Sequence, residues 1–278
     1  MPFVTPTDQG KRRTRVLING ETGMGKTQSL LTFPAPRAVL VYPGEGGYGT
    51  LPEGDADTRV LAYTAGSNPN ESSLNVINEV EAETVKILKT PGLQTFCGDG
   101  LHKFMAYVMD AMSGGAFFEG LKVKTESRGD QDVLDPRVWG QAERWLVSYL
   151  NLIRQSSVPH VVVTCWDADK QERKTKVGEK WTDVPTKKLP ALYGSMARTI
   201  MGEFSVTLHA SRRRLKPTDA KESYVWQTQQ DGEVLGAGIK APPSVVAGIP
   251  KYVPQDWAQL ATLLGVNTSN GQGAGHVG

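Results

Sequence analysis

The sequence has few cysteines, few histidines and no long apolar segment. Its 278 residues include two cysteines, Cys97 and Cys165, which are too few for a disulfide framework or a CxxC zinc motif. The four histidines show neither an HExxH motif nor Cys/His metal-ligand spacing. No apolar run approaches the ~20 residues that a membrane span needs, and residues 1–10 lack the apolar centre of a signal peptide. These absences predict a soluble protein in a reducing, cytoplasmic compartment.

An excess of charge of one sign is lacking too. The 31 Lys and Arg residues nearly balance 29 Asp and Glu residues, for a net charge of +2. This balance excludes a polycationic nucleic-acid-binding tail, but not a local basic patch. Hydrophobic residues make up 39% of the chain, enough for a sizeable core. We expect a flexible basic arm over 1–13, a single domain over 14–265 and a disordered Gly-rich tail over 266–278.

Strand-like and helix-like segments alternate through the first two thirds of the chain. Apolar runs predict strands at 15–19, 38–42, 58–63, 104–109 and 161–164, and helical spacing predicts helices at 28–33, 72–89 and 138–155. Apolar runs without alternation are typical of parallel strands buried on both faces, and the rotation of strand and helix indicates an α/β fold. Segments 204–210, 224–228 and 234–239 predict short strands that extend the sheet, and 254–264 predicts a closing helix.

A phosphate-binding loop is the strongest motif. It matches G-x-x-x-x-G-K-[ST] in full and lies between a predicted strand and a predicted helix, as the motif requires. Its glycines let several backbone N–H groups point at one phosphate, Lys26 would reach the β- and γ-phosphates, and the Thr27 hydroxyl would bind Mg²⁺. The predicted ATP-phosphate contacts are Gly20, Glu21, Thr22, Gly23, Met24, Gly25, Lys26, Thr27 and Gln28.

A nucleotide hydrolase also needs a carboxylate near Mg²⁺ at the end of a neighbouring strand. Asp110 follows the apolar run 104–109, and we interpret it as this second Mg²⁺ residue. Asp167, which follows the run 161–164, is the rival. For Asp110, which we favour, a helix N-cap or a turn residue is the alternative interpretation.

Two further polar residues follow predicted strands and are candidates for catalysis beside Lys26. Glu45 lies among glycines after the strand 38–42, where it could orient or deprotonate the attacking water. Thr164 ends the strand 161–164 and could sense the γ-phosphate; a buried Thr bonded to backbone is the alternative. For Trp166, the sequence leaves both packing and stacking open.

Together these residues resemble the RecA-like P-loop ATPases encoded by phages, including the Sak-type single-strand annealing and recombination proteins, which are phage nucleotide-binding proteins. The resemblance spans about 14–265 and is carried by the phosphate loop, the strand and Glu-Gly-Gly at 39–47, the segment 107–113 and the stretch 190–195. Two features depart from it: Trp166 stands where relatives often have His or Gln, and only Lys240 remains of a Lys-x-Arg pair that could reach a neighbour's nucleotide in trans.

The resemblance implies a RecA-like core, with a mostly parallel central sheet flanked by helices and a C-terminal antiparallel extension. It implies an Mg²⁺-dependent ATPase that acts on single-stranded DNA in phage recombination, annealing or replication, within the host cell cytoplasm. It further implies self-association as a ring or filament, and a phage single-strand binding protein as a partner.

The resemblance to RecA-like proteins implies that DNA is held by two loops, one after the strand with the Mg²⁺ carboxylate and one after the strand that ends at Thr164. Here these loops are 114–135 and 167–189, and the second is basic. Its candidate DNA contacts are Lys170, Arg173, Lys174, Lys176, Lys180 and Trp181, which combine charge with an aromatic platform. The segment 114–135 is net acidic, which counts against phosphate binding there. Two alternatives stay open: a nucleotide-gated assembly factor with little hydrolysis and no DNA binding, and a small-molecule kinase on a P-loop scaffold.

Overall fold

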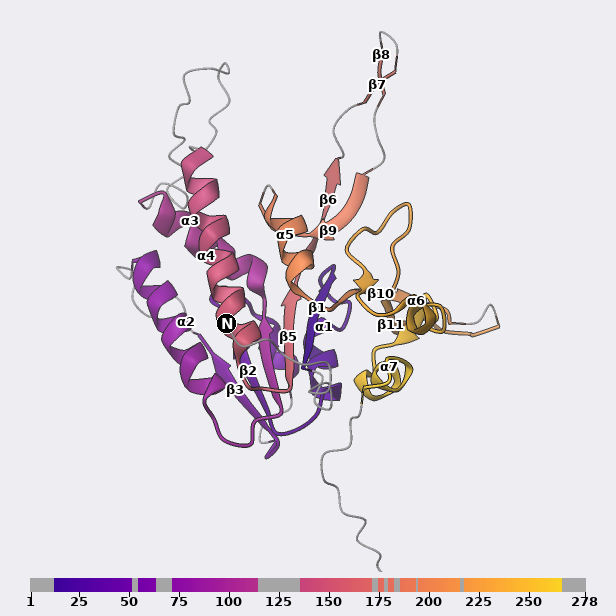
Figure 1. Ribbon diagram of the computed structural model, residues 1–278, viewed down its shortest axis with the longest axis horizontal. Coiled ribbons are helices and arrows are strands. Elements are labelled where there is room, and N and C mark those ends of the chain that lie inside the picture. The colour runs from indigo at the N-terminus through magenta and orange to yellow at the C-terminus, as the bar shows by residue number, and fades with distance from the viewer. Residues whose placement is uncertain are drawn as a thin grey trace, which may run out of the picture.

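A nine-stranded sheet forms the centre of the computed structural model (Figure 1). The structure describes residues 13–51, 55–63, 72–114, 136–171, 175–177, 180–182, 186–193, 195–215 and 218–266, without the side chains of 136 and 169–186. The main path of the sheet runs β13-β11-β10-β1-β5-β4-β2-β3, and β12 pairs with β10. Its strands are β1 (Thr14–Gly20), β2 (Arg37–Val41), β3 (Thr58–Ala62), β4 (Thr95–Asp99), β5 (His160–Cys165), β10 (Val206–Arg213), β11 (Ser223–Gln227), β12 (Gly238–Ile239) and β13 (Tyr252–Pro254).

The phosphate-loop strand β1 lies in the middle of a parallel block. It pairs in parallel with β5 on one side and β10 on the other, and β5, β4, β2 and β3 continue in parallel. The strands β11, β12 and β13 are antiparallel to their neighbours. The prediction of a mostly parallel sheet with an antiparallel C-terminal extension is therefore confirmed, except that β10 belongs to the parallel block.

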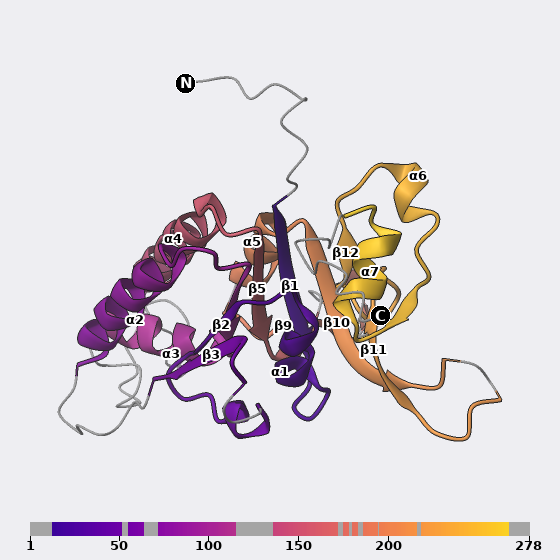
Figure 2. The ribbon, with the colours of Figure 1, turned by 90° about the horizontal axis from the view of Figure 1, so that it is seen from below.

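Helices cover both faces of the sheet (Figure 2). One face carries α2 (Ser73–Leu88), α3 (Leu101–Met112), α4 (Pro136–Gln155) and α5 (Met196–Glu203), and the other carries α1 (Lys26–Ser29), the 3-10 helix η2 (Leu30–Thr32) and α7 (Trp257–Leu263). The remaining short helices are η3 (Gly47–Thr50) and α6 (Pro243–Val246).

The apolar run of β1 is buried on both faces. Leu17 packs into the core beneath α2–α5, whereas Val16 and Ile18 pack into the opposite core with Trp257. Such a strand needs apolar residues at every position, which is why the run does not alternate with polar residues. Among the described residues, no helix is both long and apolar enough to cross a membrane.

The predicted strand at 104–109 is wrong, because this segment belongs to α3. Its residues Leu101, Phe104, Met105, Val108 and Met109 are buried in one core, and their spacing of three and four places them on one helix face. The strand in this region is β4, which was not predicted because Phe96 and Cys97 are its only apolar residues apart from Gly98, too few to form a recognisable apolar run. The other predicted elements lie within a few residues of observed ones, although β12 occupies only the end of 234–239.

The segment after β5, expected to be a loop, forms a two-stranded arm. β6 (Asp167–Gln171) pairs with β9 (Thr186–Pro190), and β7 (Thr175–Val177) pairs with β8 (Lys180–Thr182), all antiparallel. Figure 1 shows this arm extending away from the main sheet beyond the end of β5. The N-terminal segment 1–13 and the C-terminal tail 266–278, both expected to be flexible, lie outside the described residues, apart from Arg13 and Val266.

Candidate nucleotide-binding site

The phosphate loop connects β1 to α1 at the carboxyl edge of the sheet. Gly23 and Gly25 have φ angles of 78° and 77°, in the left-handed region that favours glycine. A Cβ on Gly25 would also lie 2.7 Å from Gln255 Oε1, and the Gln255 amide donates to the Met24 carbonyl at 2.8 Å. The glycines therefore serve both the curl of the loop and its close packing against the C-terminal extension.

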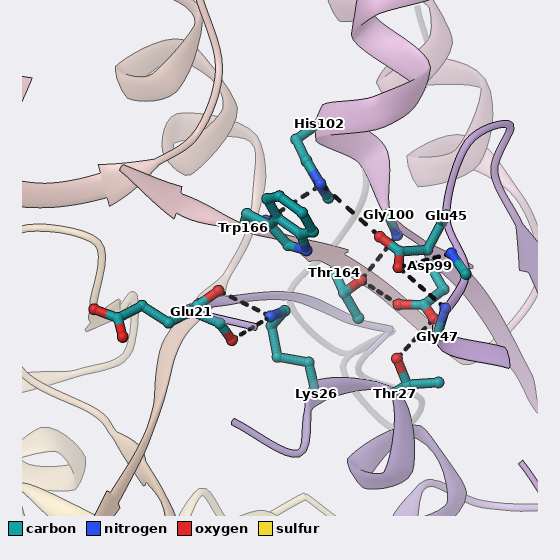
Figure 3. A network of polar contacts seen from close by, with 12 residues as sticks. Glu21, Lys26, Thr27, Glu45, Gly47, Asp99, Gly100, His102, Thr164 and Trp166 are labelled. Atoms are coloured by element: carbon teal, nitrogen blue, oxygen red, sulfur yellow. Dashed lines mark hydrogen bonds and ion pairs between the residues drawn. The ribbon is translucent and has the colours of Figure 1, made fainter. Parts of the chain in front are cut away.

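The Lys26 side chain is folded over the loop that carries it (Figure 3). Its Nζ donates to the carbonyl oxygens of Gly20 and Glu21, each at 2.8 Å, and the residue is 8% exposed. Burial lowers the pKa of the ammonium, and the nearby Asp99 opposes that shift. Because its partners are two neutral carbonyls of its own loop, the cation can exchange them for phosphate oxygens.

The carboxylate that meets the loop is Asp99, at the end of β4. Thr27 Oγ1 donates to Asp99 Oδ2 at 2.9 Å, and Thr164 Oγ1 donates to Asp99 Oδ1. The backbone N–H of Gly100 donates to Thr164 Oγ1 at 2.9 Å, which joins β4 to β5 (Figure 3). Burial raises the pKa of Asp99, and the two hydroxyl donors act in the opposite direction. Sequence analysis did not identify Asp99, because it did not predict β4. The only sequence signal for this strand and its carboxylate is the apolar pair Phe96-Cys97 followed by Gly-Asp-Gly.

The assignment of Asp110 as a Mg²⁺ residue rested on the wrong strand and is corrected. Asp110 lies in α3 and accepts a hydrogen bond of 2.5 Å from the Ser73 hydroxyl of α2, so it joins two helices. The rival Asp167 accepts from His209 Nε2 at 2.8 Å at the start of β6. Neither carboxylate takes the hydrogen bond from Thr27.

Glu45 lies in the turn after β2, and the structure brings it close to Thr27 and Asp99. Its Oε1 accepts from the backbone N–H groups of Gly46 and Gly47, each at 3.1 Å. A Cβ on Gly47 would lie 2.9 Å from Thr27 Oγ1 and 3.8 Å from Asp99 Oδ2, so this turn packs directly against the Thr27–Asp99 pair. Glu45 Oε2 lies 3.9 Å from His102 Nε2.

His102 and Trp166 complete this cluster, and sequence reasoning did not find the histidine. Their rings are stacked with centroids 4.3 Å apart, and the Trp166 backbone N–H donates to His102 Nδ1 at 3.3 Å. Burial lowers the pKa of His102 to about 3, and the cations of Lys103 and Lys26 add to the shift. The imidazole is therefore neutral near pH 7.

Lys240 is not brought to the phosphate loop of its own chain. It follows β12, where its backbone N–H donates to Ser205 O at 2.8 Å and its amine donates to the Gly202 carbonyl. The register of β1 with β10 pairs Val16 with Val206 and Gly20 with Ala210, so Lys240 lies at the opposite end of the sheet. Its role as a trans-acting finger stays a prediction. The side chains of Lys170, Arg173, Lys174, Lys176, Lys180 and Trp181 lie outside the described residues.

The strand order defines the class of the fold. The phosphate-loop strand β1 and the aspartate strand β4 are separated by β5, which carries Thr164, and Glu45 follows β2 on the far side of β4. With helices on both faces, this is the RecA-like P-loop architecture.

The solved structures that are similar to this chain include two ATPases of type III secretion systems. One is a prototypical type III secretion ATPase from pathogenic bacteria, with 13% identity, a TM-score of 0.42, and coverage of 72% of this chain and 52% of the other. The second is the assembled ATPase EscN from enteropathogenic E. coli, with 13% identity, a TM-score of 0.39, and coverage of 72% and 43%. The chain thus spans about half the length of these ATPases, and both likenesses are too distant to transfer a function. No family model and no curated protein matches the chain.

Proposed function

We propose that this protein binds ATP with Mg²⁺ and hydrolyses it. The observation that carries the proposal is the hydrogen bond between the Thr27 hydroxyl and the buried Asp99 carboxylate, directly beside Lys26 and Glu45. A phosphate loop alone indicates nucleotide binding. The carboxylates at the ends of two neighbouring strands add what hydrolysis needs.

The oxygen atoms beside the loop fit a Mg²⁺ ion. The Thr27 hydroxyl and the Asp99 carboxylate are hard oxygen ligands, and they already lie within 2.9 Å of each other. When bound with ATP, Mg²⁺ supplies positive charge against the β- and γ-phosphate oxygens. The hydroxyl of Thr164 fixes Asp99 from the other side, so we assign Thr164 to the positioning of this carboxylate.

The remaining steps fall to groups of the chain itself. Lys26 exchanges the carbonyls of Gly20 and Glu21 for phosphate oxygens, and backbone N–H groups of the loop hold the same phosphates. The Glu45 carboxylate orients the attacking water and accepts its proton. A general base must lie within hydrogen-bond reach of the proton that it takes, and the turn that carries Glu45 packs against the Thr27–Asp99 pair. The backbone amides of Gly46 and Gly47 hold its Oε1, which leaves Oε2 for this task.

We further propose that the protein is a Sak-type, phage-encoded ATPase that acts on single-stranded DNA in recombination, annealing or replication. The sequence resemblance supports this proposal. So does the arm formed by β6–β9, because it continues directly from β5 through Trp166 and its sequence is basic. DNA held on this arm would be connected to the nucleotide site through one short segment. Assembly as a ring or filament, with Lys240 reaching a neighbour, and partnership with a phage single-strand binding protein belong to the same proposal.

Steady-state hydrolysis of ATP, with and without single-stranded DNA, tests both levels of the proposal. We expect Mg²⁺-dependent turnover that single-stranded DNA stimulates. The variant E45Q should lose hydrolysis by about 10²- to 10⁴-fold and still bind ATP, whereas the matched surface variant E79Q should behave as the wild type. Turnover that persists in E45Q would remove Glu45 from this role.

A different outcome would favour the alternative function. If ATP binds, depends on Lys26 and is neither hydrolysed nor affected by DNA, the protein is a nucleotide-gated assembly factor. The net charge of the chain, only +2, favours this alternative, because it gives little general attraction for nucleic acid. Size measurements with and without ATP would then show whether the nucleotide controls assembly.

A further inference from the structure

We propose that His102 is a positioning residue for Glu45, whose Nε2–H holds the free carboxylate oxygen in place for hydrolysis while Trp166 holds the imidazole. The proposal deepens the hydrolytic function proposed above and rests on it. Figure 3 shows His102 joined by one dashed line to Trp166 and by another to Glu45.

The contacts of the ring determine which nitrogen carries the proton. The Trp166 backbone N–H donates to His102 Nδ1, so Nδ1 acts as an acceptor and carries no hydrogen. In a neutral imidazole the hydrogen then lies on Nε2. This nitrogen is the one that lies 3.9 Å from Glu45 Oε2.

The Nε2–H group has no hydrogen-bond partner among the described residues, although it is buried. A buried donor without an acceptor is costly, and the Oε2 atom of Glu45 is a carboxylate oxygen close to it. The 3.9 Å separation exceeds a hydrogen bond by less than 1 Å. Catalytic hydrogen bonds are often long without substrate and shorten in the complex, so a small rotation of Glu45 on nucleotide binding would complete this one.

The surroundings hold both partners in place. The Trp166 ring stacks on the imidazole, and Lys103 Nζ lies 4.5 Å from the centre of the Trp166 ring. Glu45 packs on Gly100, the N-cap of α3, where any Cβ would lie 2.7 Å from Glu45 Cβ and Cγ. The start of α3 and the turn after β2 therefore limit Glu45 to small movements.

The same contacts connect Glu45 to the arm. Trp166 is the single residue between β5 and β6, so a displacement of β6 moves the group that orients His102. The stack and hydrogen bond between Trp166 and His102, together with the proposed contact of His102 with Glu45, then connect the arm to the carboxylate that directs water. A ligand on the arm has a short physical route to the rate of hydrolysis.

Two substitutions at His102 test its contact with Trp166 and its proposed hydrogen bond to Glu45 one at a time. H102Q places an amide N–H where Nε2 stands and keeps a donor for Glu45. H102N places an amide near Nδ1 and keeps only the contact with Trp166. We expect H102N and H102L to lower kcat for ATP by about 10- to 100-fold, with KM and nucleotide affinity unchanged, and H102Q to restore most of kcat.

A buried histidine elsewhere and a double variant provide the controls. His160, which packs edge-on against Trp257, is a matched buried imidazole away from this cluster, and H160N should leave kcat within about twofold of the wild type. In the E45Q background, H102N should have no further effect on hydrolysis, because both substitutions act on one group.

Four results would overturn the proposal. The first is wild-type kcat in H102N, and the second is an equal loss in H102Q and H102N. The third is a loss that appears as raised KM, and the fourth is a further loss in the E45Q background. A wild-type protein that binds ATP and never hydrolyses it would overturn the proposed hydrolysis itself, and with it this role, which distinguishes that failure from the other four.

Discussion

The two ends of β1 each bury a cation, and the cations differ in what surrounds them. Arg15 lies at the amino end and is 5% exposed, whereas Lys26 follows the carboxyl end and is 8% exposed. Burial lowers the pKa of both groups, to about 10 for Arg15. By burial and pKa direction alone, the two sites look alike.

Their partners separate them. The guanidinium of Arg15 donates to carbonyl oxygens of five residues, at 3.0–3.3 Å: Thr14, Arg154, Ser156, Val158 and Pro159. Two of these carbonyls, of Arg154 and Ser156, belong to the end of α4 and the turn after it, which need donors because helix ends leave carbonyls unpaired. Lys26 has two carbonyls of its own loop, and the carboxylates of Asp99, Asp167 and Glu45 act on it from nearby. A buried charge marks a ligand site when its partners can be exchanged.

Replacing Lys26 should give the largest effect and should spare the fold. We expect K26A to lose ATP hydrolysis by on the order of 10³-fold, because the variant lacks the cation that meets the β- and γ-phosphates. The melting temperature without nucleotide should change little, since only loop carbonyls lose a donor. Hydrolysis assays and thermal melts of the same preparation check both parts.

Lys187, which precedes the Lys188 that pairs with Glu21, offers a comparison of equal charge. K187A should retain the turnover of the wild type. An equal loss of hydrolysis in K187A and K26A would mean that the net charge of the protein, and not the position of Lys26, controls hydrolysis.

Replacing Asp99 should lower activity and raise stability. Burial raises the pKa of Asp99, so in the pH range between its unfolded and folded pKa values the folded chain binds more protons at this group than the unfolded chain does. By linkage, this group makes folding less favourable as pH rises above the ordinary Asp value of about 3.9. D99N removes that penalty, and we expect a higher melting temperature at pH 7 without nucleotide or Mg²⁺, together with a loss of hydrolysis of about 10²- to 10³-fold.

The pH dependence of the melting temperature is the decisive measurement for Asp99. The gain in D99N should shrink as pH falls toward 4, where the wild-type carboxyl also becomes neutral. The exposed variant D57N should show no such gain. A melting temperature lower than that of the wild type at every pH would mean that hydrogen bonds to Thr27 and Thr164, and not the charge, dominate at this position.

Replacing Arg15 should reverse this pattern. We expect R15L to lower the free energy of unfolding by about 2–4 kcal/mol, because several buried carbonyl groups lose their donor. Turnover per folded molecule should stay near that of the wild type. Denaturant unfolding with a parallel activity assay measures both, and a selective loss of turnover in fully folded R15L would contradict the comparison of the two strand ends.

Sequence patterns predicted the frame of the molecule better than the carboxylate of its site. The apolar runs of β1, β2 and β5 are buried on both faces and leave little choice but parallel strands, and the spacing of α4 leaves little choice but a helix. The phosphate loop was also predictable, because its glycines and Lys26 are fixed by local geometry.

Tertiary contacts determine what the sequence could not show. β4 has only Phe96 and Cys97 as apolar residues, and it forms because it fits between β2 and β5. The contact of Thr27 with Asp99 joins residues 72 positions apart, and the contact of Trp166 with His102 joins residues 64 positions apart. None of these contacts leaves a period or a spacing in the chain.

Asp110 allows the smallest and most specific test. It is buried in α3 and accepts from Ser73 of α2, so its carboxylate joins two helices on one face of the sheet. We expect D110N to lower the free energy of unfolding by about 1–2 kcal/mol, because an amide is a weaker acceptor for the Ser73 hydroxyl. Turnover and its dependence on Mg²⁺ concentration should stay those of the wild type, in contrast to D99N. A raised Mg²⁺ requirement in D110N, at unchanged stability, would return the metal to the residue that the sequence suggested and would count against Asp99.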